Sequence, residues 1–269
     1  MSPQVERARP EAHARFHEEA QASFEEQLGD ILVRRVPGSR PARSERHRPC
    51  RRRSRSQGVC NQETEVSMNA DQTKIRQLVE NRALWRDAGH WERFATVWHP
   101  DGWMSATWFQ GPAADFIAAS RQGFDNGVSI LHFLGGHTSD VTGERAIAQT
   151  KMTISQRADI DGVSVDVVCT GRFYDFLSRD GAGEWTIVRR QPIYEKDRLD
   201  VVHPAECLEL DPELLARFPV GYRHLGYLQT KAGFTVKPGL SGLTGQAVER
   251  LYAEGAAWLA GSALPGRPQ

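Results

Sequence analysis

The sequence predicts an α+β protein in which about three N-terminal helices pack on one face of a curved antiparallel β-sheet. Two observations carry this prediction. Apolar residues recur at helical spacing between residues 71 and 124, and long alternating segments joined by tight turns follow between residues 146 and 198. Beyond residue 200 the periodicity weakens. We therefore expect an α+β domain over residues 68–200 and a helical C-terminal extension over residues 201–269.

Three helices are expected in the first part of the domain. The first is expected to begin at Asp71 as its N-cap, to stop near Gly89, and to place an apolar stripe at helical spacing through Ile75, Leu78, Val79, Arg82 and Trp85. The second covers residues 91–98 and ends before Pro100, because proline disfavours a continuing helix. The third opens at Pro112 and continues to Phe124.

The strands follow from period-two alternation. A strand is expected over residues 103–109, and a longer one over residues 146–156 has its alternate residues, from Ala146 to Gln156, on one face. The Asp161-Gly162 pair signals a hairpin that returns as a strand over residues 163–177. A turn at residues 179–183 then leads into the last strand, residues 185–198.

The extension is expected to hold two helices, over residues 212–231 with a break at Pro219 and over residues 246–260. The glycines between them, at positions 239, 242 and 245, indicate a linker rather than a phosphate-binding loop. The extension could form a lid, cover the open face of the sheet or mediate self-association.

Residues 1–67 differ from the rest of the chain. They hold 13 Arg, no Lys and 10 acidic residues, and every Trp and Tyr of the chain follows them. Residues 11–33 show a weak helical pattern, whereas residues 34–55 hold ten Arg against one Glu and are expected to be disordered. We assign residues 1–67 as a whole to a disordered Arg-rich tail. Two interpretations stay open for this Arg-rich tail. It could be a nucleic-acid or nuclear-import patch, or it could lack a function of its own because translation properly starts at Met68.

Composition excludes several classes of protein. The 34 basic and 34 acidic residues cancel, and residues 68–269 alone carry a net charge of −3, from 21 basic and 24 acidic residues, which argues against nucleic acid as the principal partner. No apolar run is long enough for a membrane span, and the first 20 residues do not resemble a secretory signal. The four cysteines show neither metal nor disulfide spacing, so we expect a cytoplasmic protein without a metal. Cofactor motifs such as GxGxxG and the P-loop are absent, and no cofactor is expected.

Five segments together resemble SnoaL-like proteins of the nuclear transport factor 2-like superfamily, and within it the scytalone dehydratase-like branch. They are LWRDAGHWERFATVWHPDG, ILHFLGG, IAQTKMTISQR, TGRFYDF and RRQPIYEKDR, within about residues 75–200. The resemblance implies a cone of strongly bent antiparallel sheet, closed by helices around an apolar pocket. It also implies a homo-oligomer.

The resemblance places a catalytic dyad at Asp87 and His132. A buried imidazole can accept a proton from carbon or oxygen when a second group fixes its tautomer and stabilises the imidazolium. A carboxylate bonded to the other ring nitrogen provides both effects. His137 is a rival imidazole, for which a surface-loop position is expected.

Four positions depart from the dehydratase pattern. The two tyrosines that hold a water there align with Arg86 and Ala106, its second histidine aligns with Gln156, and its pocket asparagine aligns with Arg172. These departures put dehydration of a scytalone-like ring in doubt but leave proton transfer in an apolar pocket intact. On the pocket face of its strand, Arg172 could bind a carboxylate or stabilise an enolate, as a third catalytic group. Alternatively it could form a structural bridge with an acidic neighbour.

The residues expected to contact a substrate are Trp103, Trp108, Phe116, Met152, Gln156 and Tyr194. Each of these could equally be an ordinary core residue. An aromatic-lined cavity suits a flat hydrophobic ligand such as a polyketide or terpenoid fragment. Two functions stay open: a cofactor-independent lyase or isomerase that uses the Asp87–His132 dyad, and a non-catalytic ligand-binding or assembly module of the same fold.

Overall fold

The computed structural model describes the backbone of residues 56–263 and the side chains of residues 70–263. The weak helix expected at residues 11–33 and the Arg-rich segment at residues 34–55 lie outside this part of the chain. Within it, six strands form a single sheet in the order β2-β1-β6-β5-β4-β3. The sheet is open, with β2 and β3 at its edges, and the α+β class predicted from the sequence is confirmed.

The elements follow one another in a simple order, and their bounds are these: α2 (Ser56–Asp87), α3 (Trp91–Thr96), β1 (Trp98–Ser105), β2 (Gln110–Pro112), α4 (Ala113–Asp125), β3 (Ser129–Thr142), β4 (Arg145–Ile160), β5 (Val163–Arg179), β6 (Trp185–Val201), α5 (Pro212–Ala216), the 3₁₀ turn η1 (Val220–Tyr222), α6 (Arg223–Lys231) and α7 (Gln246–Leu259). The three expected N-terminal helices and the two expected helical regions of the extension are present, including the interruption near Pro219. The second helix ends at Thr96 rather than at residue 98.

Helix α2 is longer than the sequence pattern predicted. It begins at Ser56, so residues 56–67, which were assigned to the disordered tail, are helical. No Pro or Gly lies between Gly58 and Gly89 to stop the helix from extending toward its N-terminus.

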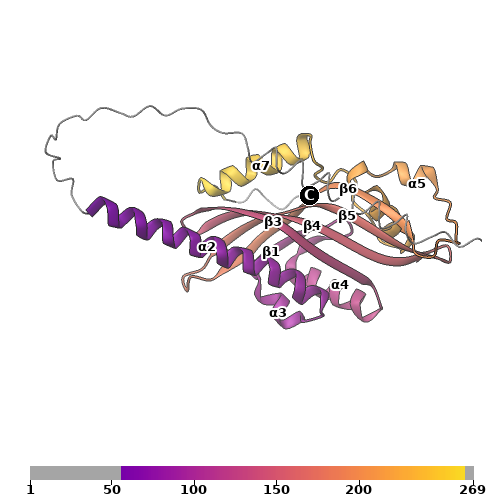
Figure 1. Ribbon diagram of the computed structural model, residues 1–269, viewed down its shortest axis with the longest axis horizontal. Helices are drawn as coiled ribbons and strands as arrows, with labels where there is room; N and C mark the ends of the chain where they lie inside the picture. The colour runs from indigo at the N-terminus through magenta and orange to yellow at the C-terminus, as the bar shows by residue number, and fades with distance from the viewer. Residues whose placement is uncertain (1–55, 264–269) are drawn as a thin grey trace, which may run out of the picture. The chain divides into compact units, whose positions relative to one another are not determined.

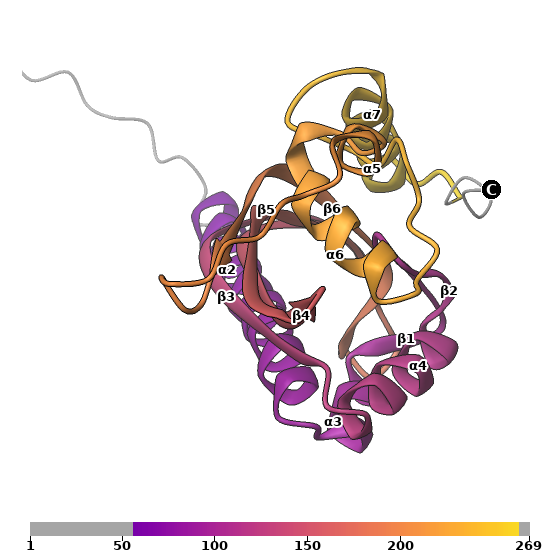
Figure 2. The same cartoon turned by 90° about the vertical axis from the view of Figure 1, so that its right-hand side faces the viewer.

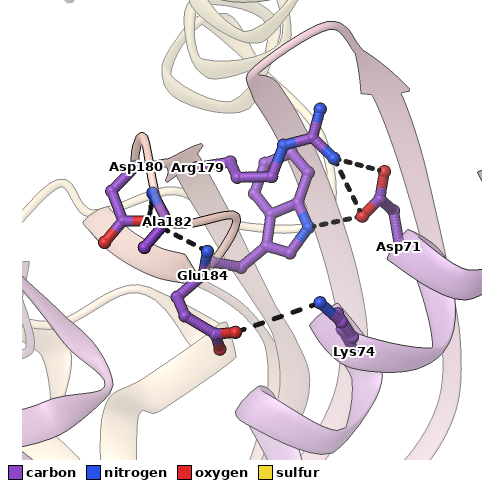
Figure 3. A network of polar contacts seen from close by, with 7 residues as sticks. Asp71, Lys74, Arg179, Asp180, Ala182 and Glu184 are labelled. Carbon is purple, nitrogen blue, oxygen red and sulfur yellow. Dashed lines mark hydrogen bonds and ion pairs between the residues drawn. The ribbon is translucent and has the colours of Figure 1, made fainter.

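The prediction that Asp71 caps this helix is therefore wrong. Asp71 lies inside α2, and its carboxylate accepts hydrogen bonds from the Arg179 guanidinium at 2.9 Å and from the Trp185 indole at 3.0 Å. Figure 3 shows Arg179 reaching Asp71 from the end of β5, with Lys74 facing Glu184 beside it. A polar residue in the helix interior thus ties α2 to the far end of a hairpin.

The strands pair antiparallel except for β1 and β6, which are parallel. The sequence predicted a fully antiparallel sheet, and this prediction is wrong for the pair of β1 and β6. The single strand expected over residues 103–109 is also wrong: β1 begins at Trp98, and a turn separates it from the short β2.

The sheet bends where its register shifts. One shift falls between Leu134 and His137 on β3, where Gly135 and Gly136 interrupt the ladder with β4. The expectation that His137 lies in a surface loop is wrong, because this bulge carries the strand onward and the half-buried His137 ring bonds the Thr150 hydroxyl at 2.7 Å. A second shift falls at Gly171 on β5, where a Cβ atom would lie 2.0 Å from the carbonyl oxygen of Ile193.

The two faces of the sheet carry separate cores. Figure 1 shows α7 on one side of the sheet and α3 and α4 on the other. Alternate β4 residues from Ala146 to Gln156 face the concave side, as predicted, with Ala146 and Ala148 fully buried against the N-terminal helices. In Figure 2 the sheet is strongly curled, and α6 lies across its concave side beside β6. Leu251 and Trp258 of α7 pack on the outer face.

Candidate functional site

The candidate site lies where the last residue of α2 meets the edge strand β3. Asp87 ends α2, and its Oδ1 lies 2.8 Å from Nδ1 of His132 while its Oδ2 accepts the main-chain N–H of His132 at 2.5 Å. The predicted pair of Asp87 and His132 therefore exists as a hydrogen-bonded dyad. A carboxylate is unfavourable at a helix C-terminus because of the helix dipole, and these donors, with Arg86 Nη1 at 3.3 Å, compensate for it.

The protonation state of the dyad follows from its surroundings. The pKa of His132 is lowered to about 4, chiefly by burial and also by the positive charges of Arg86 and Arg82, against the opposing effect of Asp87. Burial alone would raise the pKa of Asp87, but the hydrogen bonds from His132 outweigh it and the net pKa is lowered. Near neutral pH the pair is thus a neutral imidazole on a carboxylate. Because an ionised carboxylate can only accept, Nδ1 carries the hydrogen and Nε2 has a free lone pair.

His132 lines a cavity of about 40 Å³ on the concave side of the sheet. Its walls come from α2, the β1–β2 turn, α4, the sheet and α6, and they consist of Arg82, Arg86, Met104, Ala106, Thr107, Trp108, Phe116, Ile130, His132, Ile154, Gln156, Phe173, Pro192, Tyr194, Leu225 and Gln229. Most of this wall is apolar or aromatic. The volume admits a small polar group or a few water molecules, so a ring-sized molecule requires neighbouring side chains to move.

Four of the six residues expected to contact a substrate line this cavity: Trp108, Phe116, Gln156 and Tyr194. Met152 is buried in the core formed with α6. Trp103 lies on β1, which pairs with β2 on one side and with β6 on the other. Neither belongs to the cavity wall. The two positions that replace the tyrosines of the dehydratase pattern, Arg86 and Ala106, both line it.

Arg172 lies outside the site, and its expected place on the pocket face is wrong. Its guanidinium contacts Glu195 at 2.7 Å, Gln149 at 2.8 Å and the Tyr252 hydroxyl of α7 at 2.7 Å. The reason is strand alternation: Phe173 faces the cavity, so Arg172 points to the outer face. Of the two roles considered for Arg172, the geometry gives the structural bridge.

Arg82, Thr107, Leu225 and Gln229 also line the cavity and were not predicted there. The Thr107 hydroxyl lies 2.6 Å from Oε1 of Gln229, and Nε2 of Gln229 lies 3.4 Å from Gln156, so α6 closes the cavity through a buried polar chain. The residues from α6 had no sequence signal. Arg82 had one, because it occupies an apolar position of the helical stripe of α2.

A second cavity of about 30 Å³ adjoins the first and shares Arg86, Trp108, Ile130, Gln156 and Gln229 with it. Phe234, which follows α6 and is partly exposed, lines this second cavity and contacts Trp108 with ring centroids 5.4 Å apart. Phe234 and Phe124 are the exposed aromatic residues of this wall.

The part of the chain with described side chains holds no group of three His, Cys, Asp or Glu residues that could bind a metal ion. None of the described helices has the length and apolar character that a membrane crossing requires.

Comparison with known proteins bears on the same region. A family model described as a SnoaL-like domain matches residues 68–191. An uncharacterised protein of Emericella nidulans is 36% identical over 210 residues, covering 72% of this chain and 88% of that protein. Pea pathogenicity protein 2 of Fusarium vanettenii is 35% identical over 170 residues, covering 62% of this chain and 72% of that protein.

Among solved structures, a candidate scytalone dehydratase of Novosphingobium aromaticivorans is 17% identical and covers 55% of this chain and 99% of its own, with a TM-score of 0.41. No conclusion is drawn from a similarity of this level. The assignment of the chain to a family rests on the family model and on the curated relatives. The family model covers the segment that holds Asp87 and His132. The chain belongs to the SnoaL-like family.

Proposed function

We propose that this protein is a cofactor-independent lyase or isomerase that moves a proton on a small hydrophobic substrate, with His132 as the general base and acid and Asp87 as its positioning residue. One observation carries the proposal: the imidazole that lines the cavity is held by a carboxylate through its Nδ1. A solvated surface pair would have no reason to combine these two features.

The chemistry follows from the protonation state. With its hydrogen on Nδ1, His132 can use Nε2 to remove a proton from a carbon next to a carbonyl group, which leaves an enolate and an imidazolium. Asp87 stabilises that imidazolium without itself taking the proton. The imidazolium then returns the proton, either to another carbon, which completes an isomerisation, or to a departing hydroxyl group, which leaves as water and completes a dehydration.

The wall of the cavity favours an apolar, planar substrate. Trp108, Phe116, Phe173 and Tyr194 provide rings, and Gln156 provides a buried amide for a polar substituent. A polyketide- or terpenoid-like fragment fits this description by its chemistry. Such a molecule exceeds the volume of the cavity in the present conformation, so side chains must move to admit it. We place its entrance at Trp108 and Phe234, which line the adjoining cavity.

The small volume of the cavity favours a second function, that of a non-catalytic binding or assembly module. At about 40 Å³ the cavity is nearly filled by its own side chains, as expected of a non-catalytic binding or assembly module in which the dyad is a structural hydrogen bond.

We propose a homo-oligomer and a cytoplasmic location for both of these functions. Leu131 and Phe133 on the outer face of edge strand β3 are 62% and 78% exposed, and they offer an apolar surface for self-association.

The test is a screen for proton exchange. The full-length protein is incubated in D₂O with a panel of small β-hydroxy ketones, β-hydroxy acids and unsaturated isomers, and the products are read by mass spectrometry. The proposal expects deuterium incorporation next to the carbonyl group, with loss of water from the hydroxy compounds. A protein that binds members of the panel but exchanges no hydrogen in any of them would be a binding module instead.

A further inference from the structure

Arg82 is a buried cation without a conventional partner. It is 1% exposed, lies on the inner face of α2, and lines the cavity together with His132. Among the described residues, its Nε and Nη1 have no hydrogen-bond acceptor, and Nη2 has only the sulfur of Met104 at 3.8 Å. A guanidinium carries five N–H donors, and leaving them unpaired in the interior costs free energy.

Arg190 provides the contrast within the same core. Its guanidinium is also fully buried, but two of its nitrogens bind the Asp175 carboxylate at 2.5 and 2.6 Å. Arg86 likewise has Asp87. The core around the cavity therefore holds three arginines and two carboxylates, and His132 is neutral near pH 7, which leaves one positive charge without a counter-ion.

Aromatic rings surround the guanidinium carbon of Arg82. It lies 5.3 Å from the ring centroids of Phe94 and Trp98 and 5.5 Å from that of Phe173. Such contacts stabilise a cation and hold the guanidinium plane in place, but they accept none of its N–H groups. The charge is thus positioned and its donors remain unused.

We propose that Arg82 binds the carboxylate of the substrate, which makes the natural substrate a small apolar carboxylic acid. This inference rests on the proposed function for the location of the substrate beside His132. A planar guanidinium in a water-poor cavity matches a carboxylate in charge and in the geometry of its donors. With the acid group on Arg82, the apolar remainder lies along the aromatic wall, in the cavity that His132 shares.

A bound carboxylate also acts on the base. Arg82 and Arg86 lower the pKa of His132 through their positive charge, while Asp87 raises it. An anion between Arg82 and the substrate carbon would offset part of that positive field and make the imidazole a stronger base when the substrate is present. Arg82 would then select a substrate that is an acid and, through the bound carboxylate, would also make His132 a stronger base.

The experiment compares matched probes that differ in charge and hardly in shape. Isothermal titration calorimetry on the full-length protein measures the binding of benzoate against benzamide, and of butyrate against butyramide. We expect each acid to bind about tenfold tighter than its amide, or more, since hydrogen bonds to charged groups have that magnitude. In Arg82→Met the preference should disappear, and in Arg82→Lys it should persist in part.

Arg172→Met is the matched control, because it removes a guanidinium from the outer face and should leave the preference unchanged. His132→Gln separates the two proposals because it removes the proposed base and leaves Arg82 in place. The variant should still prefer acid to amide, and this result does not depend on whether His132 transfers a proton. The inference is overturned if wild-type protein binds neither acid at millimolar concentration, binds acid and amide equally, or keeps its preference in Arg82→Met. Circular dichroism and the Tm of each variant establish that it is folded. If Arg82→Met does not fold, the partial preference expected of Arg82→Lys tests the assignment, and equal binding of acid and amide by the wild-type protein still overturns it.

Discussion

Asp87 holds His132 at two points, because its Oδ1 lies 2.8 Å from the ring Nδ1 and its Oδ2 accepts the main-chain N–H at 2.5 Å. The first contact selects the tautomer and the second fixes the backbone of β3 against the end of α2. A single carboxylate thus sets both where the imidazole lies and which nitrogen is free to react.

Asp87→Asn should therefore damage turnover more than stability. The amide can donate to Nδ1 and so favours the tautomer with its hydrogen on Nε2, which is the wrong nitrogen for a base. We expect kcat to fall about 10²–10⁴-fold on any substrate found by the exchange screen. ¹⁵N NMR of the imidazole should show the change of tautomer. Asp101→Asn, at an exposed position on β1, is the control and should leave both readouts unchanged. A variant with the wrong tautomer and full activity would contradict the role given to Asp87.

Acidification should destabilise the protein through His132. Its pKa is lowered by burial from 6.5 to about 4, so between these values the unfolded chain binds a proton that the folded chain does not. Stability is therefore present above pH 6.5 and is lost as the pH falls toward 4. We expect the free energy of unfolding to drop by about 2 kcal/mol more between pH 7 and pH 5 in wild-type protein than in His132→Gln. Urea titrations at the two pH values measure this difference. The half-buried His137, whose pKa burial also lowers, is common to both proteins and cancels. Equal losses would show that His132 titrates near its ordinary pKa.

The ion pair of Asp175 and Arg190 should be costly to break from one side. Both side chains are fully buried and joined by two hydrogen bonds. Asp175→Asn leaves Arg190 as a second uncompensated cation close to Arg82, and we expect a loss of about 3–5 kcal/mol in the free energy of unfolding. The double variant Asp175→Leu with Arg190→Met should recover most of this loss, because it removes both charges together. Urea unfolding curves distinguish the outcomes, and a double variant no more stable than Asp175→Asn would contradict the electrostatic explanation.

Local signals in the sequence predicted most of the helices and hairpins, because each depends on neighbouring residues: the Asp161-Gly162 turn and the alternation from Ala146 to Gln156 are examples. The parallel pairing of β1 with β6 could not be predicted in this way, since it joins strands about 90 residues apart in the chain. The contribution of α6 to the cavity, through Leu225 and Gln229, depends on the same kind of long-range packing.

The site shows the same division. The resemblance to a family located Asp87 and His132, which the structure brings together, but it also placed Arg172 on the wrong face. The alternation of buried residues along β5, with Val167, Cys169 and Phe173 on the inner face, would have excluded Arg172. Arg82 was visible as a charge in an apolar stripe, and only the three-dimensional arrangement shows that it lines the cavity and that two of its nitrogens have no acceptor.

Arg172 should consequently be dispensable for turnover. Arg172→Gln removes contacts with Glu195 and Tyr252 on the outer face, where α7 packs, and touches nothing in the cavity wall. We expect kcat and KM within about twofold of wild type and a loss of stability of about 1 kcal/mol, as is usual for a partly exposed ion pair with hydrogen bonds. Steady-state kinetics and thermal unfolding check the two parts. A large fall in kcat with intact folding would return Arg172 to the site.

The central claim is that His132 transfers a proton on the substrate, and the most direct test is the rate of deuterium incorporation from D₂O by wild-type protein and by His132→Gln. Glutamine keeps a polar side chain that can bond Asp87 but cannot act as a base near neutral pH. The proposed function predicts that the exchange rate falls by about 10²–10⁴-fold while the probe acids still bind. A fall of only a few fold, with binding and folding unchanged, would contradict it.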